Sequence, residues 1–310
     1  MYQYYMNNIF ILIGPTASGK SNLAMLLMSK FPFEIINADL YSTYKGLNIG
    51  TAKPLKEELN KYKHHLINIL EPATDYNVSQ YCKDANECIN EILSLNKIPL
   101  IVGGTMMYIY QLLNGLSHEY DLSDTDSKLI QYIQNQYTNE QIVKAISSFN
   151  PDLTNKININ DSYRIEKLLE RLISNKNKKN NFKGLYKEKN LKIHIIFITI
   201  DDRELLRENI KKRTSNMLHD GLIDEVKNLL CKFNLNNKTQ CMKAIGYKET
   251  LQFLNKDISL EELHSSITIA TQQLAKRQVT WMNKFKIDYR FSYPENNYHS
   301  LFNYIKKILN

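Results

Sequence analysis

One segment near the start of the chain, Gly14-Pro-Thr-Ala-Ser-Gly-Lys-Ser21, constrains the fold more than any other. It matches the pattern G-x-x-x-x-G-K-[ST], which at average composition arises by chance in about one chain in a hundred of this length. An apolar run at residues 8–13 precedes the segment, and leucines at helical spacing follow it. The sequence therefore predicts a strand, a glycine-rich loop and a helix in this order.

This loop is suited to binding phosphate groups. Gly14 and Gly19 permit backbone conformations and a close approach that a Cβ atom would obstruct, so successive N–H groups can point at an anion. The N-terminus of the predicted helix, near Lys20, adds positive potential. Lys20 also supplies a point charge, and Ser21 supplies a hydroxyl ligand for Mg²⁺. The loop predicts a phosphate site but does not define a reaction.

Four further apolar runs, at residues 34–37, 66–70, 98–102 and 193–200, predict additional strands. Helical periodicity separates them, for example from Val78 to Leu95. Strands that alternate with helices indicate an α/β fold, in which helices cover both faces of a parallel sheet. We therefore predict a P-loop core of this class.

Polar and small residues follow two of these predicted strands. Asp39 comes after the second strand, and Gly103, Gly104 and Thr105 follow the run at residues 98–102. The ligand site of a parallel sheet lies beyond the C-terminal ends of its strands, so we expect these residues there. No carboxylate follows residues 98–102, where NTP-hydrolysing proteins usually hold Mg²⁺, which disfavours an NTPase or kinase. Asp39 is a candidate base or magnesium partner, with a turn or helix-capping acid as the alternative.

The composition changes at residues 116–190, which are polar and rich in Asn and Lys. Their apolar residues recur at helical spacing, with a break at Pro151. We interpret residues 1–115 as the first part of the core, 116–190 as a mainly helical insertion and 191–310 as the completion of the core with C-terminal helices. The helices predicted in this last part span residues 203–213, 222–233 and 260–285. Residues 175–190 form a basic, Asn-rich segment that we expect to be a solvated linker.

The chain has a net charge of +8, which suits an anionic partner such as nucleic acid or a phosphorylated metabolite. A biased genome composition explains the same charge equally well. Only seven of the 40 basic residues are arginines, and none precedes Arg164. Because arginine binds phosphate in a planar, bidentate manner, each of these few arginines is a candidate contact.

The four cysteines, Cys82, Cys88, Cys231 and Cys241, lack the spacing of a zinc site or a disulfide framework. We interpret them as reduced packing residues of a cytosolic protein. No apolar stretch approaches the roughly 18–20 residues that a membrane span needs, and the first ten residues do not resemble a secretory signal. A soluble, cytoplasmic protein without a membrane partner is expected.

Six motifs occur in order along residues 9–285: GPTASGKS (14–21), Asp39 with YSTYKGLNIGTAKP (41–54), IPLIVGGT (98–105), RTSNMLHDGLIDEV (213–226), KAIGYKE (243–249) and AKRQVTW (275–281). Together they resemble the motifs of bacterial-type tRNA dimethylallyltransferases. The segments IGTAKP, VGGT and AKRQxTW are far more specific than the phosphate loop. The resemblance implies that dimethylallyl diphosphate, rather than ATP, occupies that loop, and that tRNA receives the five-carbon group at N6 of adenosine 37.

The resemblance also assigns roles at the site. Asp39 matches the general base, Thr105 a hydroxyl contact to the diphosphate, and Arg213 a diphosphate clamp. The diphosphate-binding residues are Gly14, Thr16, Ala17, Ser18, Gly19, Lys20 and Ser21, and Ser21 is the ligand of the Mg²⁺ cofactor. These roles suit allyl transfer, which needs the leaving-group charge stabilised and a proton removed from the exocyclic amine.

The tRNA anticodon stem-loop is the expected macromolecular partner, and we expect the chain to be a monomer. Its target base must leave the stack to reach the pocket, and single-stranded loops are recognised by stacking and phosphate contacts. The positions that match tRNA contacts are Asp39, Leu40, Tyr41, Ser42, Lys128, Tyr163, Arg164, Lys167, Lys243, Gly246, Tyr247, Gln272, Lys276, Arg277 and Gln278.

The sequence departs from the family pattern at several positions. Leu40 and Ser42 replace a Ser and a Gln, and Met106 and Met107 replace a Gly-Leu pair. Lys128, Lys167 and Gln272 stand where the family commonly has Arg. Because Ser42 is short and Lys lacks the Arg fork, the departures affect tRNA affinity and substrate range more than reaction type. Two alternatives stay open: a P-loop nucleotide kinase or NTPase, and a tRNA-binding homologue with impaired catalysis.

Overall fold

A computed structural model of the chain describes residues 7–116, 122–155, 157–174, 182–293 and 298–310. The chain divides into two compact units. The core unit comprises Met1–Asn114 and Gly184–Asn310, and the insertion unit comprises Gly115–Lys183. Each unit is described separately below.

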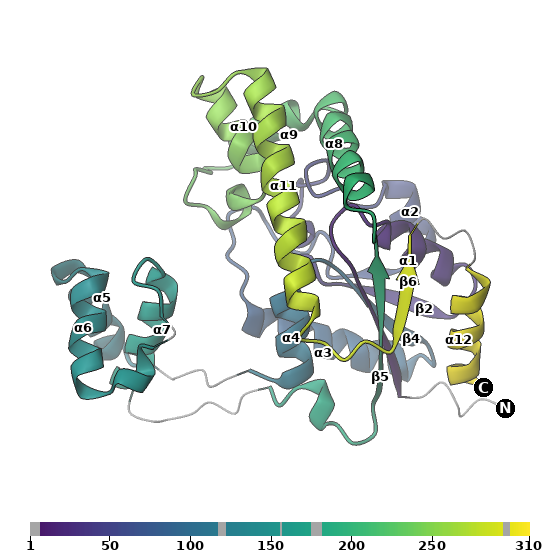
Figure 1. Cartoon of the computed structure of the whole chain (residues 1–310), viewed down its shortest axis with the longest axis horizontal. Coiled ribbons are helices and arrows are strands. Elements are labelled where there is room, and N and C mark those ends of the chain that lie inside the picture. The colour runs from purple at the N-terminus through teal and green to yellow at the C-terminus, as the bar shows by residue number, and fades with distance from the viewer. Residues whose placement is uncertain (1–6, 117–121, 156, 175–181, 294–297) are drawn as a thin grey trace. The chain divides into compact units, whose positions relative to one another are not determined.

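The core unit is built on a parallel sheet, as predicted, and this sheet has six strands. Its strands are β1 (Asn8–Ile13), β2 (Phe33–Asn37), β3 (His64–His65), β4 (Ile98–Val102), β5 (Lys192–Thr199) and β6 (Tyr289–Ser292). They follow the order β3-β2-β4-β1-β5-β6, and every neighbouring pair is parallel. Figure 1 shows β5 and β6 side by side and running in the same direction. The predicted α/β fold is therefore confirmed.

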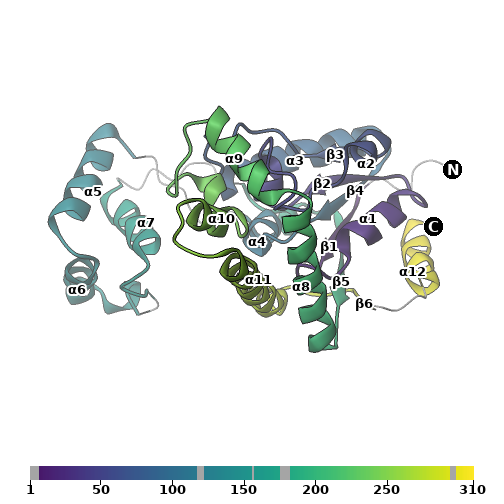
Figure 2. The ribbon, with the colours of Figure 1, turned by 90° about the horizontal axis from the view of Figure 1, so that it is seen from above.

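Helices connect these strands and extend the core unit. They are α1 (Lys20–Met28), α2 (Lys56–Lys61), α3 (Val78–Ser94), α4 (Met106–Asn114), α8 (Arg203–His219), α9 (Leu222–Lys232), α10 (Tyr247–Leu254), α11 (Leu260–Met282) and α12 (His299–Leu309). Three short 3-10 turns, η1 (Tyr41–Thr43), η3 (Leu185–Lys187) and η4 (Gln240–Lys243), interrupt the loops. Among them, α8 and α11 pack side by side, as Figure 2 shows.

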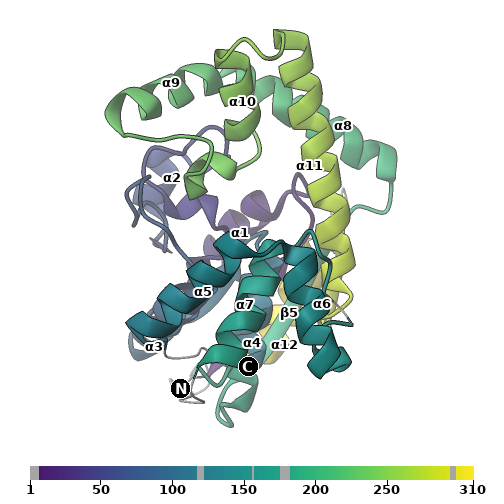
Figure 3. The same cartoon turned by 90° about the vertical axis from the view of Figure 1, so that its left-hand side faces the viewer.

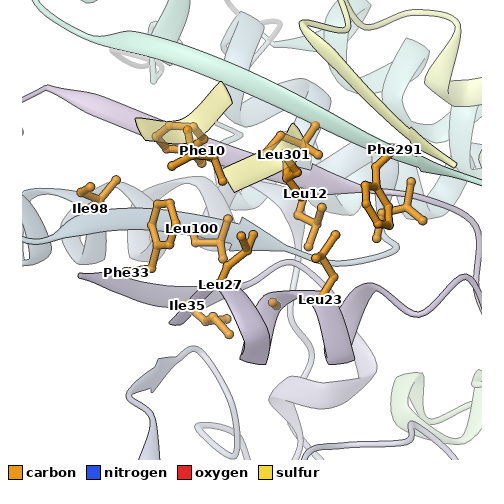
Figure 4. Packing of buried hydrophobic residues seen from close by; sticks show 14 of the residues in the cluster. Phe10, Leu12, Leu23, Leu27, Phe33, Ile35, Ile98, Leu100, Phe291 and Leu301 are labelled. Carbon is orange, nitrogen blue, oxygen red and sulfur yellow. The ribbon is translucent and has the colours of Figure 1, made fainter. Parts of the chain in front are cut away.

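One hydrophobic cluster fastens the first helix and the last helix to the sheet. Phe10 and Leu12 of β1 pack with Leu23 and Leu27 of α1 and with Leu301 of α12, as seen in Figure 4. The alternate residues of β1 are fully buried as well, so the strand is covered on both faces. This is why the sequence of β1 is uniformly apolar instead of alternating.

A second hydrophobic cluster joins α8, α9, α10 and the first part of α11, which lie together in Figure 3. Tyr44 and Leu47, from the segment that follows β2, are fully buried within this cluster. The cluster therefore fixes the segment after β2 against helices that come more than 160 residues later in the chain.

The insertion unit is helical. It contains α5 (Asp124–Gln136), α6 (Asn139–Phe149), η2 (Pro151–Leu153) and α7 (Ser162–Ile173). Ser123 and Thr138 cap α5 and α6 with reciprocal capping boxes. The small core of the unit consists of Ile130, Ile142, Ile165 and Leu169. Residues 175–181, within the predicted basic linker, lie outside the described part of the chain.

Two strand assignments differ from the sequence-based expectation. The apolar run at residues 66–70 is not a strand, and the third strand is formed by the two preceding histidines. Leu66 and Asn68 have φ values of 61° and 55°, which are incompatible with extended backbone. The four-residue strand β6 was not anticipated, because its pairing with β5 depends on tertiary structure. Within the described residues, no helix has both the length and the apolar character needed to cross a membrane.

Strand β2 carries a carboxylate inside its apolar run. Glu34 is only 4 % exposed, and its two oxygens lie 2.5 Å from Lys97 Nζ and 2.7 Å from His65 Nε2. Burial alone would raise the pKa of Glu34, but the hydrogen bonds from Lys97 and His65 outweigh it and lower the pKa below its ordinary value of 4.5. The lowered pKa means that this cluster stabilises the folded state above about pH 4.5 and loses that effect as the pH falls further.

We expect Glu34→Gln to reduce the free energy of unfolding by about 1–3 kcal/mol at pH 7, because a buried hydrogen-bonded carboxylate is removed from two donors. The difference from the wild type should shrink as the pH falls from 4.5 through the lowered pKa of Glu34, because Glu34 then becomes protonated in the folded protein. Urea unfolding at pH 7 and at pH 4 measures both effects. Equal losses at the two pH values would contradict the ionic role of Glu34.

Candidate active site

The glycine-rich loop links β1 to α1 in a conformation that requires its two glycines. A Cβ atom on Gly14 would lie 2.8 Å from Ser18 Oγ and 2.9 Å from the carbonyl oxygen of Ile198. Gly19 precedes α1 with a φ of +84°, in the left-handed region. The first turn of α1, with its unpaired N–H groups and positive end, therefore starts directly at Lys20 and Ser21.

A cavity of about 570 Å³ opens beside this loop, within the core unit. The segments that line it come from the C-terminal ends of β2 and β4, the loop Gly50–Ala52, helix α8 and helix α11. This is the edge of the sheet at which parallel α/β proteins bind ligands. Its volume is within the range of small-molecule sites.

Lys20 folds back onto the loop. Its Nζ donates to the carbonyl oxygens of Gly14 at 2.8 Å and Pro15 at 2.7 Å. Burial lowers the pKa of Lys20 to about 7, the neighbouring charge of Arg213 lowers it as well, and Asp39 opposes this change. A buried lysine of this kind is ready to receive an anion, which would replace the lost hydration and favour the charged amine.

Arg213 reaches the same cavity from α8. Burial lowers the pKa of its guanidinium, and the Asp39 carboxylate opposes this shift. Its Nη2 lies 3.5 Å from the carbonyl oxygen of Thr51, a long hydrogen bond. Lys20 and Arg213 therefore place two basic groups in one buried space, and the Asp39 carboxylate is close enough to influence the pKa of both.

Polar contacts hold the turn that carries Asp39 in place. Asn37 Nδ2 donates to the Asp39 carbonyl at 2.9 Å, Asp39 Oδ1 accepts from Tyr41 N at 3.0 Å, and Thr105 Oγ1 accepts from Leu40 N at 3.0 Å. A Cβ atom at Gly104 would lie 3.7 Å from Asp39 Oδ2, so the carboxylate faces a second glycine loop, Gly103-Gly104, which follows β4. Asp39 thus has a defined orientation at the cavity.

Gln278 of α11 connects the two glycine loops. Its Oε1 accepts from Thr16 N at 2.8 Å, and its Nε2 donates to the Gly104 carbonyl at 2.9 Å. The side chain is only 5 % exposed, although it borders the cavity. Gln278 therefore fixes the phosphate loop relative to the loop beside Asp39.

The structure brings many of the predicted site residues together. Those that line the cavity are Thr16, Ala17, Ser18, Gly19, Lys20, Ser21, Asp39, Tyr41, Ser42, Arg213, Lys243, Arg277 and Gln278. Those of the core unit outside this lining are Gly14, Leu40, Thr105, Gly246, Tyr247, Gln272 and Lys276. Tyr247 is fully buried, and its hydroxyl donates to Glu225. Lys128, Tyr163, Arg164 and Lys167 belong to the insertion unit.

Several residues of the cavity were not assigned from the sequence. Gly50, Thr51 and Ala52 line it, and the motif IGTAKP could have indicated them because it contains all three. His64 and Ile67 also border the cavity, but no sequence pattern distinguishes them. Within the described residues, no group of three or more His, Cys, Asp or Glu side chains forms a metal-binding cluster.

Comparison with known proteins extends these observations. A model of the IPP transferase family matches residues 42–285. A tRNA dimethylallyltransferase from Coxiella burnetii is 36 % identical over 279 residues, covering 89 % of this chain and 90 % of the relative. One from Francisella tularensis subsp. novicida is 35 % identical over 294 residues, covering 93 % and 94 %.

A solved structure gives the same result. The crystal structure of the tRNA isopentenylpyrophosphate transferase from Bacillus halodurans superimposes with a TM-score of 0.70 at 27 % identity. The match covers 98 % of this chain and 97 % of that one. With the family match spanning most of the sequence and the fold in agreement, the chain belongs to the IPP transferase family.

Proposed function

We propose that this protein transfers the dimethylallyl group from dimethylallyl diphosphate to N6 of adenosine 37 in the tRNA anticodon loop and releases diphosphate. The observation that carries the proposal is the convergence of Lys20, Arg213 and Asp39 on one cavity beside the phosphate loop. Two cations suit a leaving diphosphate, and one carboxylate suits a base. Family membership and the names of the relatives support the same reaction class.

The phosphate loop has the features of a site prepared for an anion. Within the described part of the chain, Ser18 Oγ is buried without a hydrogen-bond partner. Among the described residues, Lys20 Nζ donates its hydrogen bonds to the loop carbonyls of Gly14 and Pro15. A diphosphate in the cavity would supply acceptors for both groups and for the first N–H groups of α1.

In the proposed reaction, the exocyclic amine of adenosine attacks the first carbon of the dimethylallyl group, and the bond from that carbon to the diphosphate oxygen breaks. The bonding electron pair leaves with the diphosphate. Lys20, Arg213 and the loop amides stabilise the charge that develops there. Asp39 accepts the proton that the amine loses when the carbon–nitrogen bond forms. The product is the N6-substituted adenosine.

The oxygen groups around the cavity are compatible with Mg²⁺. Ser21 is exposed to the cavity at the start of α1 and would supply one hydroxyl oxygen ligand. Because the described residues provide no cluster of acidic ligands, magnesium would take most of its ligands from diphosphate and water, as it usually does. When bound, the ion would supply additional charge for the leaving group.

The substrate tRNA would be recognised by both units of the chain. Exposed Lys243 and Arg277 offer phosphate contacts at the rim of the cavity. In the insertion unit, the Tyr163 side chain is 64 % exposed and therefore available to stack on an unpaired base. The monomeric state and the tRNA contacts that the family resemblance implies are part of the proposal.

The decisive experiment is transfer of labelled dimethylallyl groups to unmodified tRNA in vitro, followed by nucleoside analysis. Label in N6-substituted adenosine, at a position lost when A37 is mutated, supports the proposal. Binding of tRNA without any turnover would instead favour a catalytically impaired binding protein. Turnover of Mg-ATP without transfer would favour a P-loop kinase or NTPase.

A further inference from the structure

A carboxylate outside the assigned site holds one wall of the cavity. Glu225, in the first turn of α9, accepts hydrogen bonds from the backbone N–H groups of Asn48 at 3.0 Å, Ile49 at 2.9 Å and Gly50 at 3.4 Å. The hydroxyl of Tyr247 donates to the same carboxylate at 2.5 Å. We call Glu225, Tyr247 and these three N–H groups the Glu225 clamp.

The loop that enters the clamp fits it closely. A Cβ atom on Gly50 would lie 2.4 Å from a ring carbon of Tyr247 and 3.0 Å from Leu222. At the far end of the loop, buried Lys53 donates to the Tyr44 carbonyl at 2.7 Å and to Asn68 Oδ1 at 2.6 Å. The loop is therefore fixed at both ends, and its middle residues have little freedom to move.

The middle of this loop faces the diphosphate side of the cavity. Gly50, Thr51 and Ala52 line the cavity, and the Thr51 carbonyl accepts a long hydrogen bond from the Arg213 guanidinium, at 3.5 Å. Arg213 itself lies on α8, one helix before Glu225. A shift of the loop would thus move the acceptor of Arg213 without touching Arg213 directly.

We propose that Glu225 is a positioning residue, which holds the Thr51 carbonyl in place through the Glu225 clamp and thereby aims Arg213 at the diphosphate. This inference rests on the proposed function for the role of Arg213. The carboxylate is needed because it offers acceptors only, and every group that faces it is a donor. An amide in its place would turn one N–H₂ group toward N–H or O–H donors.

The test is a double-mutant cycle with Glu225→Gln and Arg213→Ala, measured by calorimetry with inorganic pyrophosphate and by kcat/KM for transfer. We expect Glu225→Gln to weaken pyrophosphate binding and kcat/KM about tenfold. In the Arg213→Ala background the same change should have less than a twofold effect, because the residue that it positions is gone. Glu225→Asp, which retains the charge but shortens the reach, should behave in the same way.

Additive losses in the cycle, or wild-type values for both Glu225 variants, would overturn the positioning role. Glu34→Gln is the matched control, because it also removes a buried carboxylate with two partners but lies outside the cavity lining. It should lower stability and leave kcat/KM unchanged. Pyrophosphate binding by the wild type, with a non-additive cycle but no prenyl transfer, would overturn the proposed function and leave the clamp intact.

Discussion

Asp39→Asn is expected to reduce kcat for dimethylallyl transfer about 10²- to 10⁴-fold, the usual contribution of a general base. The asparagine keeps the shape of the side chain and an oxygen for the N–H of Tyr41, so the turn after β2 should be preserved. What it removes is the proton acceptor that faces Gly104 and the cavity. The loss should therefore fall on kcat and not on the fold.

Binding of pyrophosphate separates this role from a structural one. The Asn37 and Thr105 contacts that hold the Asp39 turn use backbone atoms of Asp39 and Leu40, and the substitution leaves them in place. Removal of a negative charge close to an anion site should retain or strengthen pyrophosphate binding at pH 6, where Lys20 is charged. Single-turnover kinetics and calorimetry measure the two quantities on the same variant.

Asp257→Asn is a suitable control, because it removes one exposed carboxylate outside the cavity lining. It should have wild-type kinetics. Full transfer activity of Asp39→Asn would exclude Asp39 as the base, and a parallel loss of pyrophosphate binding would indicate that the carboxylate acts by holding the site together.

Lys20→Met should reduce kcat/KM about 10²- to 10³-fold, comparable with the removal of one preorganised charge-stabilising donor. Methionine fills a similar volume and leaves the Gly14 and Pro15 carbonyls without the donor that the structure gives them. Unlike Asp39→Asn, this variant should also lose affinity for pyrophosphate. The pattern of losses thus distinguishes a residue that holds the leaving group from one that removes the proton.

The lowered pKa of Lys20 adds a pH dependence. Because its pKa is about 7, the amine is largely neutral at pH 8 and must bind a proton when an anion arrives. Affinity of the wild type for pyrophosphate should therefore fall as the pH rises above 7, by up to about tenfold per unit.

Calorimetry between pH 6 and pH 8.5 provides this measurement, and Lys20→Met is the reference. Titration of pyrophosphate itself affects both proteins alike, so the difference between their slopes reports the lysine. Equal slopes would mean that Lys20 stays charged throughout this range and that burial does not control its proton.

Much of the core could be predicted from the sequence, because it depends on local patterns. The strand–loop–helix unit around Gly14–Ser21 can be predicted from one short segment of sequence. The uniformly apolar strands indicate a sheet that is covered on both faces. The run at residues 66–70 was misassigned because its composition is that of a strand, whereas its backbone turns at Leu66 and Asn68. Composition does not report a positive φ at a non-glycine residue.

The residues of the candidate site likewise include some that local sequence patterns predict and others that they do not. The phosphate loop and Asp39 follow predicted strands, so their positions at the sheet edge could be derived from the sequence. Arg213 was found only through the family resemblance, because nothing local distinguishes it from a solvated helix charge. The contacts of Gln278 with the two glycine loops, and those of Glu225 with the backbone of Asn48, Ile49 and Gly50, span more than 170 residues, and only the folded structure shows them.

The hydrogen bonds of Gln278 divide the phosphate loop into a part that is bound to the protein and a part that is open to a ligand. The N–H of Thr16 already donates a hydrogen bond to Gln278, although Thr16 lines the cavity. The segment from Ser18 to Ser21 also lines the cavity and has no contact with Gln278 among the hydrogen bonds of the described residues. An inhibitor that recruits Thr16 N–H must expel the glutamine and leave the Gly104 carbonyl without its donor, at a cost of about 1–3 kcal/mol. Compounds designed as diphosphate mimics should therefore bind the segment from Ser18 to Ser21 and leave the Thr16 N–H to Gln278. Contacts with the Gln278 side chain could then provide selectivity over other P-loop proteins.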